Sequence, residues 1–403
     1  MLDIAVCGAG PAGLSAALLL HRAGHRVTLF ERFSEPKPLG SGLMLQMTGL
    51  GVLERLGLGE AIHARGHKVD RFVGRAVPSG RMVLDVRYDA LPGHQYALAV
   101  HRAALFEVLF NEVRQHGISL QGNFELQEID NVSGNRAVLV DNKGLRTSAF
   151  DLVVDALGSR SPSLPQLYRM QTAPMEYGAL WATLPAPEGA FQPHTLEQRY
   201  QKASVMIGVL PVGRHDAVTQ DQVTFFWSLR NRDYASWREA GLDAWKDRVR
   251  SLWPETEKLL DGIGSAEQLV FARYSHHTLR KPHHGAVATI GDAAHSTSPQ
   301  LGQGANMAML DAAALADALS AKAELPDALA AYADARRFHV RLYQAMSAMF
   351  TPFYQSDSRS LPAVRDMLVS PAARIPFVSR LLASMVRGSW GLRQAKRLPG
   401  TER

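Results

Sequence analysis

The sequence predicts an α/β protein in which a parallel-sheet domain is interleaved with an antiparallel-sheet domain and followed by a helical C-terminal segment. Three observations support this organisation. A strand–helix–strand pattern opens the chain over residues 2–32, a strand–loop–helix pattern returns after residue 285, and strand-rich segments lie between them. The chain therefore divides into two interleaved domains rather than two domains in series.

The length and composition are those of a globular protein with a large core. The 403 residues are 46% hydrophobic and 20% charged, which suffices for two or three domains. No apolar run is long enough to predict a membrane span, and no basic segment precedes the first apolar run as in a secretory signal. The single Cys7 excludes an internal disulfide, and we expect a cytoplasmic protein. No histidine and cysteine spacing predicts a metal site.

Basic residues are concentrated at the C-terminal end of the chain. Residues 364–403 carry eight basic and two acidic side chains, so their net charge (8 − 2 = +6) equals that of the whole chain. We interpret this charge as the solvated face of a terminal helix, and weak contact with an anionic membrane surface is the alternative. We expect no nucleic-acid partner. The basic residues are Arg365, Arg374, Arg380, Arg387, Arg393, Lys396, Arg397 and Arg403.

A glycine-rich turn joins the first strand to the first helix, in the stretch VCGAGPAGLSAALLLHRAGHRVTLFER. Gly8, Gly10 and Gly13 have the G-x-G-x-x-G spacing. The first glycine permits a tight turn, the second lets the backbone approach a pyrophosphate, and the third allows close contact of helix and strand. Glu31 lies 18 residues past Gly13 (31 − 13 = 18), where its carboxylate can accept hydrogen bonds from ribose hydroxyls. Because both strands and the helix flank the glycines, the motif predicts a Rossmann-like dinucleotide site.

A second cluster, GDAAHSTSPQLGQGAN, lies late in the chain. Asp292 follows a buried strand, and Gly302 and Gly304 lie just before a long helix. The free backbone N–H groups and the dipole of that helix therefore point toward whatever binds there. Asn306 adds a side-chain amide that can donate and accept, and Pro299 stiffens the loop.

These two motifs, with HRAAL at residues 101–105 between them, resemble the class A FAD-dependent monooxygenases, aromatic hydroxylases with the para-hydroxybenzoate hydroxylase fold. The resemblance covers roughly residues 1–345, and GDAAHSTSPQLGQGAN matches the family's late motif without a gap. The tail, with FYQSDSRSLPAVRDML, is similar to that of the ubiquinone-biosynthesis hydroxylases in the same superfamily.

The resemblance assigns cofactor contacts along the chain. The first glycine motif would hold the FAD pyrophosphate, Glu31 and Arg32 the adenosine end, and the backbone at Leu126 the adenine. Arg102 and the Gly40–Gly42 loop would contact the flavin, with Asp292 at the ribityl and pyrophosphate region and the late glycines against the flavin ring. The implied cofactor-binding residues are Gly8, Ala9, Gly10, Pro11, Ala12, Gly13, Glu31, Arg32, Gly42, Arg102, Leu126, Asp292, Pro299, Gly302, Gly304, Ala305 and Asn306.

One middle motif departs from the family pattern. The family has G-A-D-G-x-x-S, whereas this chain has DALGSRS, in which Asp155 and Leu157 replace the glycine and the aspartate. That motif is tied to the handling of both FAD and NAD(P)H, so the choice between NADH and NADPH stays open. No second G-x-G-x-x-G follows a strand, which favours a nicotinamide that binds transiently.

The substrate and catalytic residues are predicted less directly. Trp181, Phe225 and Trp227 lie on strand-like segments and could form an aromatic wall, although core packing is the alternative. Met44 and Gln46 follow the flavin loop and could reach the substrate or the ring. The catalytic candidates are Gln46, Pro299 and His295, and for His295 a structural hydrogen bond is the favoured alternative.

We therefore predict a cofactor-binding domain of residues 1–67, 100–170 and 277–345, a substrate-binding sheet domain of residues 68–99 and 171–276, and a basic helical segment of residues 346–403. The resemblance implies that NADH or NADPH reduces FAD, that O₂ gives a flavin C4a-hydroperoxide, and that a small aromatic substrate is hydroxylated. A flavin reductase or halogenase of the same architecture, or a membrane-surface flavoprotein acting through the basic tail, are alternatives. The W-x-W-x-I-P motif usual in halogenases is absent. A monomer or homodimer is expected.

Overall fold

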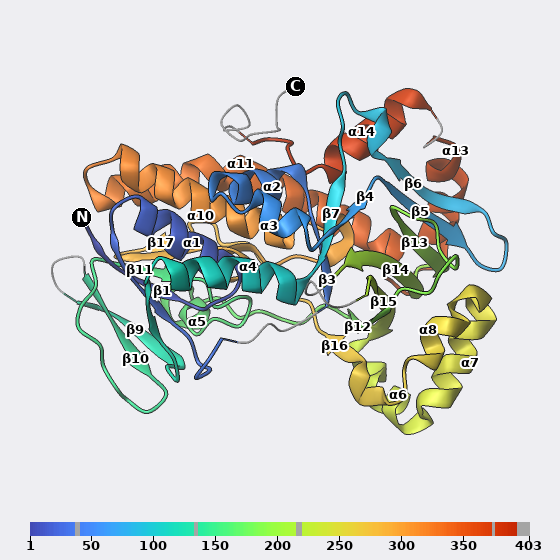
Figure 1. The fold of residues 1–403 in the computed structure, drawn as a ribbon, viewed down its shortest axis with the longest axis horizontal. Helices are drawn as coiled ribbons and strands as arrows, with labels where there is room; N and C mark the ends of the chain where they lie inside the picture. Colours follow the sequence, from blue (N-terminus) through green and yellow to red (C-terminus); the bar gives the residue numbers. More distant parts are fainter. Residues whose placement is uncertain (37–40, 133–135, 215–219, 373–374, 393–403) are drawn as a thin grey trace.

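The computed structural model describes residues 1–36, 41–132, 136–214, 220–372 and 375–392, which form two sheet-based halves lying side by side (Figure 1). The mostly parallel sheet lies on the left of that view and the mostly antiparallel sheet on the right. The long helices α10 (Gly304–Ala321) and α11 (Leu325–Tyr354) run across the top of the parallel half, and α11 continues toward the right half.

The six-stranded sheet joins segments from the beginning, middle and late part of the chain. Its central strand β1 pairs in parallel with β2 on one side and β11 on the other, with Ile4 opposite Val27 and Leu152. β11 pairs in turn with β18, where Val153 lies opposite Val287. This pairing confirms the interleaved α/β fold. The strand order is β17 (His283–His284), β18 (Val287–Thr289), β11 (Leu152–Asp155), β1 (Asp3–Cys7), β2 (Arg26–Phe30) and β8 (Ser119–Gln121).

Helices pack on this sheet through apolar side chains. α1 packs against both α4 and α10, and their buried side chains share one core with β1 and β11, which excludes water from the sheet. A hairpin of β9 (Leu126–Val132) and β10 (Arg136–Asp141) projects at the lower left of Figure 1. The helices of this half also include α1 (Pro11–Arg22), α2 (Met47–Arg55), α3 (Gly59–His63), α4 (Arg102–Gln115), α5 (Ser163–Tyr168) and α9 (Asp292–His295).

The seven-stranded sheet forms the second half. All neighbouring strands are antiparallel except β13 and β5, which run in parallel with Leu196 opposite Phe72. The strand order is β16 (Val270–Ala272), β12 (Tyr177–Pro185), β15 (Gln222–Arg230), β14 (Val205–Gly213), β13 (Thr195–Gln201), β5 (Arg71–Ala76) and β6 (Met82–Arg87).

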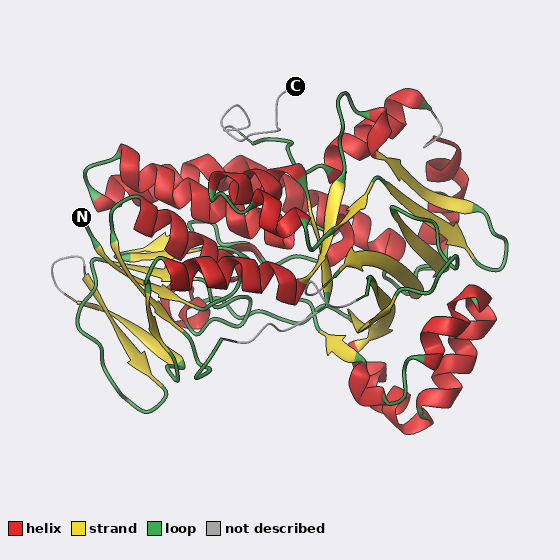
Figure 2. Cartoon of the chain, viewed as in Figure 1, coloured by secondary structure: helices red, strands yellow, loops and turns green. Residues whose placement is uncertain are grey.

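Two groups of helices cover the two faces of this sheet, as Figures 1 and 2 show. On one face, Trp245 packs with Phe225 and Trp227. On the other face lie the end of α11 and the C-terminal helices, with a π-helical turn at Arg365–Val369. The helices are α6 (Tyr234–Ala240), α7 (Leu242–Leu252) and α8 (Glu257–Asp261) on the first face, and α12 (Ser360–Val364), α13 (Ser370–Ala372) and α14 (Pro376–Val386) on the second.

A three-stranded sheet connects the two halves. β7 (Ala97–His101) pairs with β3 (Gly42–Leu45) on one side and β4 (His67–Val69) on the other, and it also packs against β14. The chain thus crosses between the halves beside the predicted flavin loop. Short 3₁₀ turns complete the structure at Tyr88–Ala90, Asn231–Asp233, Pro254–Thr256, Ala266–Gln268 and Pro299–Leu301.

Two local predictions differ from the structure. The strand β13, with sequence TLEQRYQ, was not predicted because its side chains are mostly polar, although the strand is largely buried within the sheet. The sequence DYASWREAGLDAWKDRVRSLW, residues 233–253, predicts a single helix, whereas the structure has two helices, α6 and α7. They separate at Gly241, whose φ of +86° favours glycine and ends the first helix.

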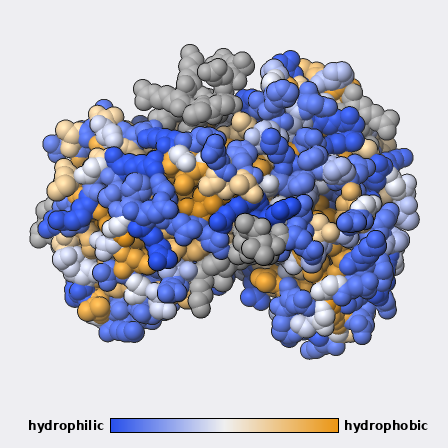
Figure 3. All heavy atoms as spheres, viewed as in Figure 1, coloured by the Kyte–Doolittle hydropathy of each residue, from blue (hydrophilic) through white to orange (hydrophobic). Residues whose placement is uncertain are grey.

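The surface shows no extended apolar band on the face drawn in Figure 3, where polar and apolar side chains are interspersed. No helix within the described ranges is long and apolar enough to cross a membrane. Cys7 is buried in β1, as expected for a core residue, and its burial raises the pKa of the thiol well above its usual range.

Candidate functional site

The first glycine motif forms the turn from β1 into α1. Gly8 has a φ of +102°, and a Cβ there would lie 2.8 Å from the Ala156 carbonyl oxygen. A Cβ at Gly13 would lie 1.8 Å from the Gly8 carbonyl oxygen, so both positions require glycine for the fold itself. At Gly10 the extended backbone suits any residue, and a Cβ would meet no protein atom within 4 Å. The protein itself would therefore accept a side chain at Gly10, and only a molecule bound beside Gly10 would clash with it.

The acid that follows β2 contacts this turn directly. The Ala9 backbone N–H donates to the Glu31 carboxylate at 2.9 Å, so Glu31 lies beside the glycine loop as the ribose assignment requires. Arg32 is exposed, and its guanidinium lies 4.7 Å from the Phe33 ring centroid. Leu126 is buried at the start of β9. Their contacts with adenosine stay predictions.

The late motif forms the connection from β18 into α10, which contains the short helix α9 and the 3₁₀ turn Pro299–Leu301. Gly291 has a φ of +61°, and its N–H donates to Asp311 at 2.9 Å. Asp292 follows and is exposed. Gly302 takes a left-handed conformation with φ +61° directly before α10, and no side chain caps that helix. The α10 N-terminus thus presents backbone N–H groups where an electron-rich ligand could accept them.

Asn306 joins the two flavin-side segments. Its Oδ1 accepts from the Gln46 backbone N–H at 2.8 Å, and its Nδ2 donates to the carbonyls of Met44 and Gly302 at 3.0 and 3.1 Å. The side chain is fully buried, so its amide positions β3 against α10 and has no free donor for a cofactor. The predicted direct contact of the Asn306 side chain is therefore replaced by a positioning role.

A cavity of about 500 Å³ lies between the two motifs and the seven-stranded sheet. The N-termini of α1 and α10 both contribute to its wall, although Gly10 and Gly304 are nearly three hundred positions apart in the sequence. Its walls continue along the inner face of the sheet and the C-terminal helices. The predicted residues that line it are Gly10, Pro11, Ala12, Gly42, Met44, Arg102, Trp181, Asp292, Pro299, Gly302, Gly304 and Ala305. Gly40 lies outside the described residues.

Two predicted substrate-wall residues lie on the wrong face of the sheet. Phe225 and Trp227 pack against Trp245 of α7, on the face turned away from the cavity. Phe226, between them, lines the cavity beside Trp181, with ring centroids 4.8 Å apart. The assignment of Phe225 and Trp227 is therefore wrong by one register position, because neighbouring strand residues point to opposite faces.

Two catalytic candidates have structural partners instead. Gln46 is fully buried, accepts a hydrogen bond from the Tyr88 hydroxyl, and does not line the cavity. His295 is buried, and its Nε2–H donates to Asp311 Oδ2 at 2.5 Å. The structure thus contradicts a direct substrate contact for either residue and supports the structural alternative for His295. Of the three candidates, Pro299 alone lines the cavity.

The partner of His295 belongs to a buried charge network. Asp311 also accepts from Arg336 Nε at 2.7 Å, and Arg336 Nη1 donates to His339 Nδ1 at 2.9 Å. Burial alone would raise the pKa of Asp311, but His295 and Arg336 hold it at about 2. His339 Nε2–H in turn donates to the Gly388 carbonyl at 2.8 Å. The network therefore links the late motif to α11 and the C-terminal segment.

We predict that acid destabilises the fold through His339. Burial and the nearby Arg336 charge lower the pKa of His339 to about 3, against 6.5 when exposed. The unfolded chain therefore binds a proton below pH 6.5 that the folded chain rejects, and the free energy of unfolding falls toward pH 3, by ~1.4 kcal/mol per pH unit. Denaturant unfolding at several pH values measures this slope. His339→Gln should make the slope shallower, whereas exposed His94→Gln should not; equal slopes in His339→Gln and wild type would refute the assignment.

The departing middle motif forms its own buried network. Asp155 accepts from Ser161 Oγ at 2.6 Å, from the Leu157 N–H at 3.0 Å, and from the Ser163 hydroxyl. Burial raises the pKa of Asp155. Gly158 lines the cavity. The aspartate thus stiffens the turn that follows β11, next to Gly8.

Several cavity residues were not predicted from the sequence. They come from the unpredicted strand β13, from β5, β15 and the segment after β16, and from helices that lie beyond the motifs. Alternation along β13 could have found Tyr200 had the strand been recognised, but no local signal placed Arg365 here. The principal ones are Phe72, Gln198, Tyr200, Phe226, Tyr274, Phe350, Tyr354 and Arg365.

Comparison with known proteins defines the class. The FAD-binding domain profile matches residues 1–346. The chain is 29% identical to 6-methylpretetramide 4-monooxygenase of Streptomyces rimosus, over 97% of this chain and 93% of that protein. It is 26% identical to 6-hydroxynicotinate 3-monooxygenase of Pseudomonas fluorescens, over 78% and 82%. Both of these relatives are monooxygenases, and other relatives are FAD-dependent monooxygenases and hydroxylases.

The chain belongs to the FAD-binding domain family, and FAD as its cofactor is confirmed. Solved structures support the fold. Klebsiella pneumoniae HpxO, solved with FAD and uric acid, superposes with a TM-score of 0.79 at 19% identity, over 95% of this chain and 97% of that chain. 2-Methyl-3-hydroxypyridine-5-carboxylic acid oxygenase gives 0.76 at 22% identity, over 92% and 94%. The resemblance and fold class predicted from the sequence are therefore confirmed.

Proposed function

We propose that this protein hydroxylates a small aromatic substrate with one atom of O₂, using FAD and transient NADH or NADPH. The overall reaction converts substrate, O₂, NAD(P)H and a proton to hydroxylated substrate, NAD(P)⁺ and water. The observation that carries the proposal is the single cavity that joins the two cofactor motifs to the inner face of the sheet. Relatives that act on 6-hydroxynicotinate and urate support an aromatic or heterocyclic substrate.

The residues of the chain fit FAD. The open space at Gly10 can admit a pyrophosphate, the uncapped α1 and α10 N-termini can donate N–H groups to anionic oxygens, and exposed Arg102 adds a positive charge at the cavity wall. Glu31 would accept from ribose hydroxyls, and Asp292 would bind near the ribityl chain. When bound, FAD would supply the redox chemistry that activates O₂, and the mostly apolar walls of the cavity would limit the access of water.

The proposed reaction is tested by screening aromatic compounds for those that accelerate NADH or NADPH oxidation by the FAD-loaded protein. Under ¹⁸O₂, the product should gain one labelled oxygen atom. Coenzyme oxidation that yields only hydrogen peroxide with every compound would favour the flavin reductase alternative. The same screen measures the preference between NADH and NADPH.

Asp292→Ala should lower FAD affinity by at least about 10-fold, which corresponds to the loss of one good hydrogen bond to a charged or polar group. Exposed Asp292 has no hydrogen bond or ion pair within the described parts of the chain, so its loss should not affect the apoprotein's stability. FAD titration followed by flavin fluorescence measures the affinity, and thermal unfolding measures the stability. Unchanged FAD affinity would contradict the role of the late motif.

A second proposal concerns the C-terminal segment: weak contact with an anionic membrane surface. Five of the ten large apolar side chains that are exposed in the described chain lie within residues 364–381: Val364, Met367, Ile375, Phe377 and Leu381. Exposed Arg380 lies within this range and exposed Arg359 lies shortly before it, and neither has an ion pair within the described residues. Apolar and basic side chains together suit an anionic lipid surface. Arg393, Lys396, Arg397 and Arg403 lie outside the described residues.

Vesicle co-sedimentation tests this contact. Vesicles containing anionic lipid should retain the protein at low salt and release it at high salt, because screening weakens attraction between exposed charges. Phe377→Ser should weaken the binding, whereas Leu145→Ser, at a similarly exposed position in the loop after β10, should not. Absence of the protein from the anionic vesicle pellet would refute the proposal and leave the enzymatic one intact.

A further inference from the structure

Part of the cavity wall is a cluster formed by Tyr200, Tyr354 and Arg365. Tyr200 lies on β13 and Tyr354 ends α11. Arg365 begins the π-helical turn of the C-terminal segment, beyond the residues that the family profile matches. The sequence predicted Arg365 as part of a solvated basic face, but it is fully buried.

The Arg365 guanidinium packs against both tyrosine rings, whose centroids are 5.4 Å apart. Its central carbon is 5.0 Å from the Tyr200 ring centroid and 5.2 Å from that of Tyr354, within the range of cation–π attraction. Its Nε donates to Asp366 at 2.8 Å, and its two terminal nitrogens donate to the carbonyls of Phe353 and Lys202 at 2.9 and 3.2 Å. A guanidinium has five N–H groups, so two (5 − 3) remain for another partner.

The two tyrosine hydroxyls are donors without an acceptor in the described chain. Neither makes a hydrogen bond there, whereas the Tyr274 hydroxyl in the same cavity accepts from Trp181 at 2.9 Å. Burial raises the pKa of Tyr200 well above its usual range and that of Tyr354 to about 12, so both phenols stay protonated at neutral pH. Cavity-lining Asp85 is held by Arg71 and Arg87 and does not compete.

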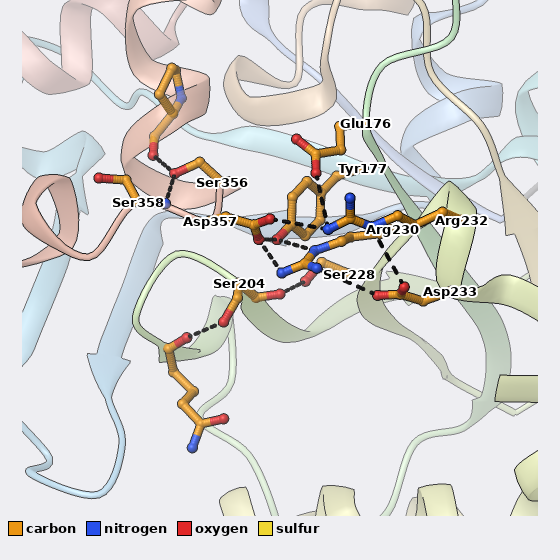
Figure 4. A network of polar contacts seen from close by, with 12 residues as sticks. Glu176, Tyr177, Ser204, Ser228, Arg230, Arg232, Asp233, Ser356, Asp357 and Ser358 are labelled. Carbon is orange, nitrogen blue, oxygen red and sulfur yellow. Dashed lines mark hydrogen bonds and ion pairs between the residues drawn. The ribbon is translucent and has the colours of Figure 1, made fainter. Parts of the chain in front are cut away.

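Ion pairs and hydrogen bonds hold the segment that follows Tyr354 against the seven-stranded sheet. Asp357 accepts from the Tyr177 hydroxyl at 2.7 Å and from Arg230 and Arg232, as Figure 4 shows. The neighbouring Ser356 N–H donates to the Ala203 carbonyl at 3.1 Å. These contacts tie the end of α11 to β12, β15 and the turn after β13. The cluster is therefore held in place before any substrate arrives.

We propose that Tyr200, Tyr354 and Arg365 bind a hydrogen-bond acceptor oxygen of the substrate, a carbonyl or phenolate oxygen on its aromatic skeleton. This inference rests on the proposed function and specifies its substrate class. Two neutral O–H donors and a guanidinium already paired with Asp366 suit one oxygen acceptor. Through Arg365, the C-terminal segment would thus contribute directly to substrate binding.

Two isosteric probes test the proposal: 2-acetylnaphthalene, which carries a carbonyl oxygen, and 2-isopropylnaphthalene, which does not. Binding is measured on the full chain with FAD by quenching of tryptophan fluorescence, and Trp181→Phe identifies the signal from the cavity wall. Wild-type protein should bind the acetyl probe at least about 10-fold more tightly, since an unmatched buried donor costs about that factor. Tyr200→Phe and Tyr354→Phe should each reduce this preference about 5- to 10-fold. Tyr234→Phe, on helix α6 outside the cavity, should leave it unchanged.

Equal affinity for the two probes, absence of binding by both, or an unchanged preference in both tyrosine variants would overturn the proposal. The fluorescence signal does not depend on turnover. A protein that binds the acetyl probe selectively but oxygenates nothing would therefore refute the proposed function while it supports this cluster.

Discussion

Gly10→Val is expected to abolish FAD binding while the apoprotein keeps its fold. A side chain at this position meets no protein atom within 4 Å, and the backbone there is extended, so nothing in the chain opposes it. The valine would instead occupy the space that a pyrophosphate needs beside the α1 N-terminus. We expect FAD affinity to fall by at least about 100-fold, the equivalent of ~2.7 kcal/mol.

The measurement combines FAD titration with thermal unfolding of the apoprotein. Gly264→Val is the matched control, because its Cβ would meet its nearest neighbour, Gln268, at an ordinary 3.6 Å on the other half of the molecule. It should change neither property. Gly13→Ala should behave oppositely to Gly10→Val and lose stability without any cofactor, since its Cβ would lie 1.8 Å from the Gly8 carbonyl oxygen. Tight FAD binding by Gly10→Val would disprove the assignment of the first motif.

Asp311→Ala should cost about 3–5 kcal/mol of folding stability, because it leaves buried Arg336 without its counter-charge and removes the acceptor of His295 and of the Gly291 N–H. The Gly291 turn carries Asp292, so FAD affinity should fall as well. Asp317→Ala is the matched control on the same helix. Its pair with Arg55 is partly exposed and should contribute less than about 1 kcal/mol.

Denaturant unfolding of the two variants measures the loss of folding stability in each. A loss in Asp311→Ala no larger than that in Asp317→Ala would mean that the buried network adds nothing to stability. The expected order follows from solvation, since water can replace a lost partner at the surface and cannot do so in the interior.

The parts of the fold that depend on local pattern could be predicted from the sequence. The first strand, turn and helix followed from their glycine spacing, and the interleaving followed from the return of a strand–loop–helix pattern late in the chain. The strand β13 was missed because its polar residues carry no alternation strong enough to recognise, although Leu196 and Tyr200 point into the cavity.

The site was predictable where backbone conformation determines it and not where side-chain direction does. Gly10, Asp292 and Gly302 line the cavity as expected. Phe225 and Trp227 were assigned to the wrong face because composition identifies a strand but not its register. Gln46 was taken as reaching the ligand because its buried partner, Tyr88, comes from another segment of the chain, whereas the structural hydrogen bond favoured for His295 is present, with Asp311 as its acceptor. The burial of Arg365 is likewise a tertiary property that charge counting misses.

Structure determination of the FAD-loaded protein tests the central claim most directly, namely that the two motifs form one cofactor cavity. We predict that the pyrophosphate lies beside Gly10 and that the flavin ring lies in the cavity lined by Met44, Pro299 and Gly302. A flavin bound elsewhere, with Gly10 and Gly302 in contact with different molecules or with solvent alone, would contradict the account.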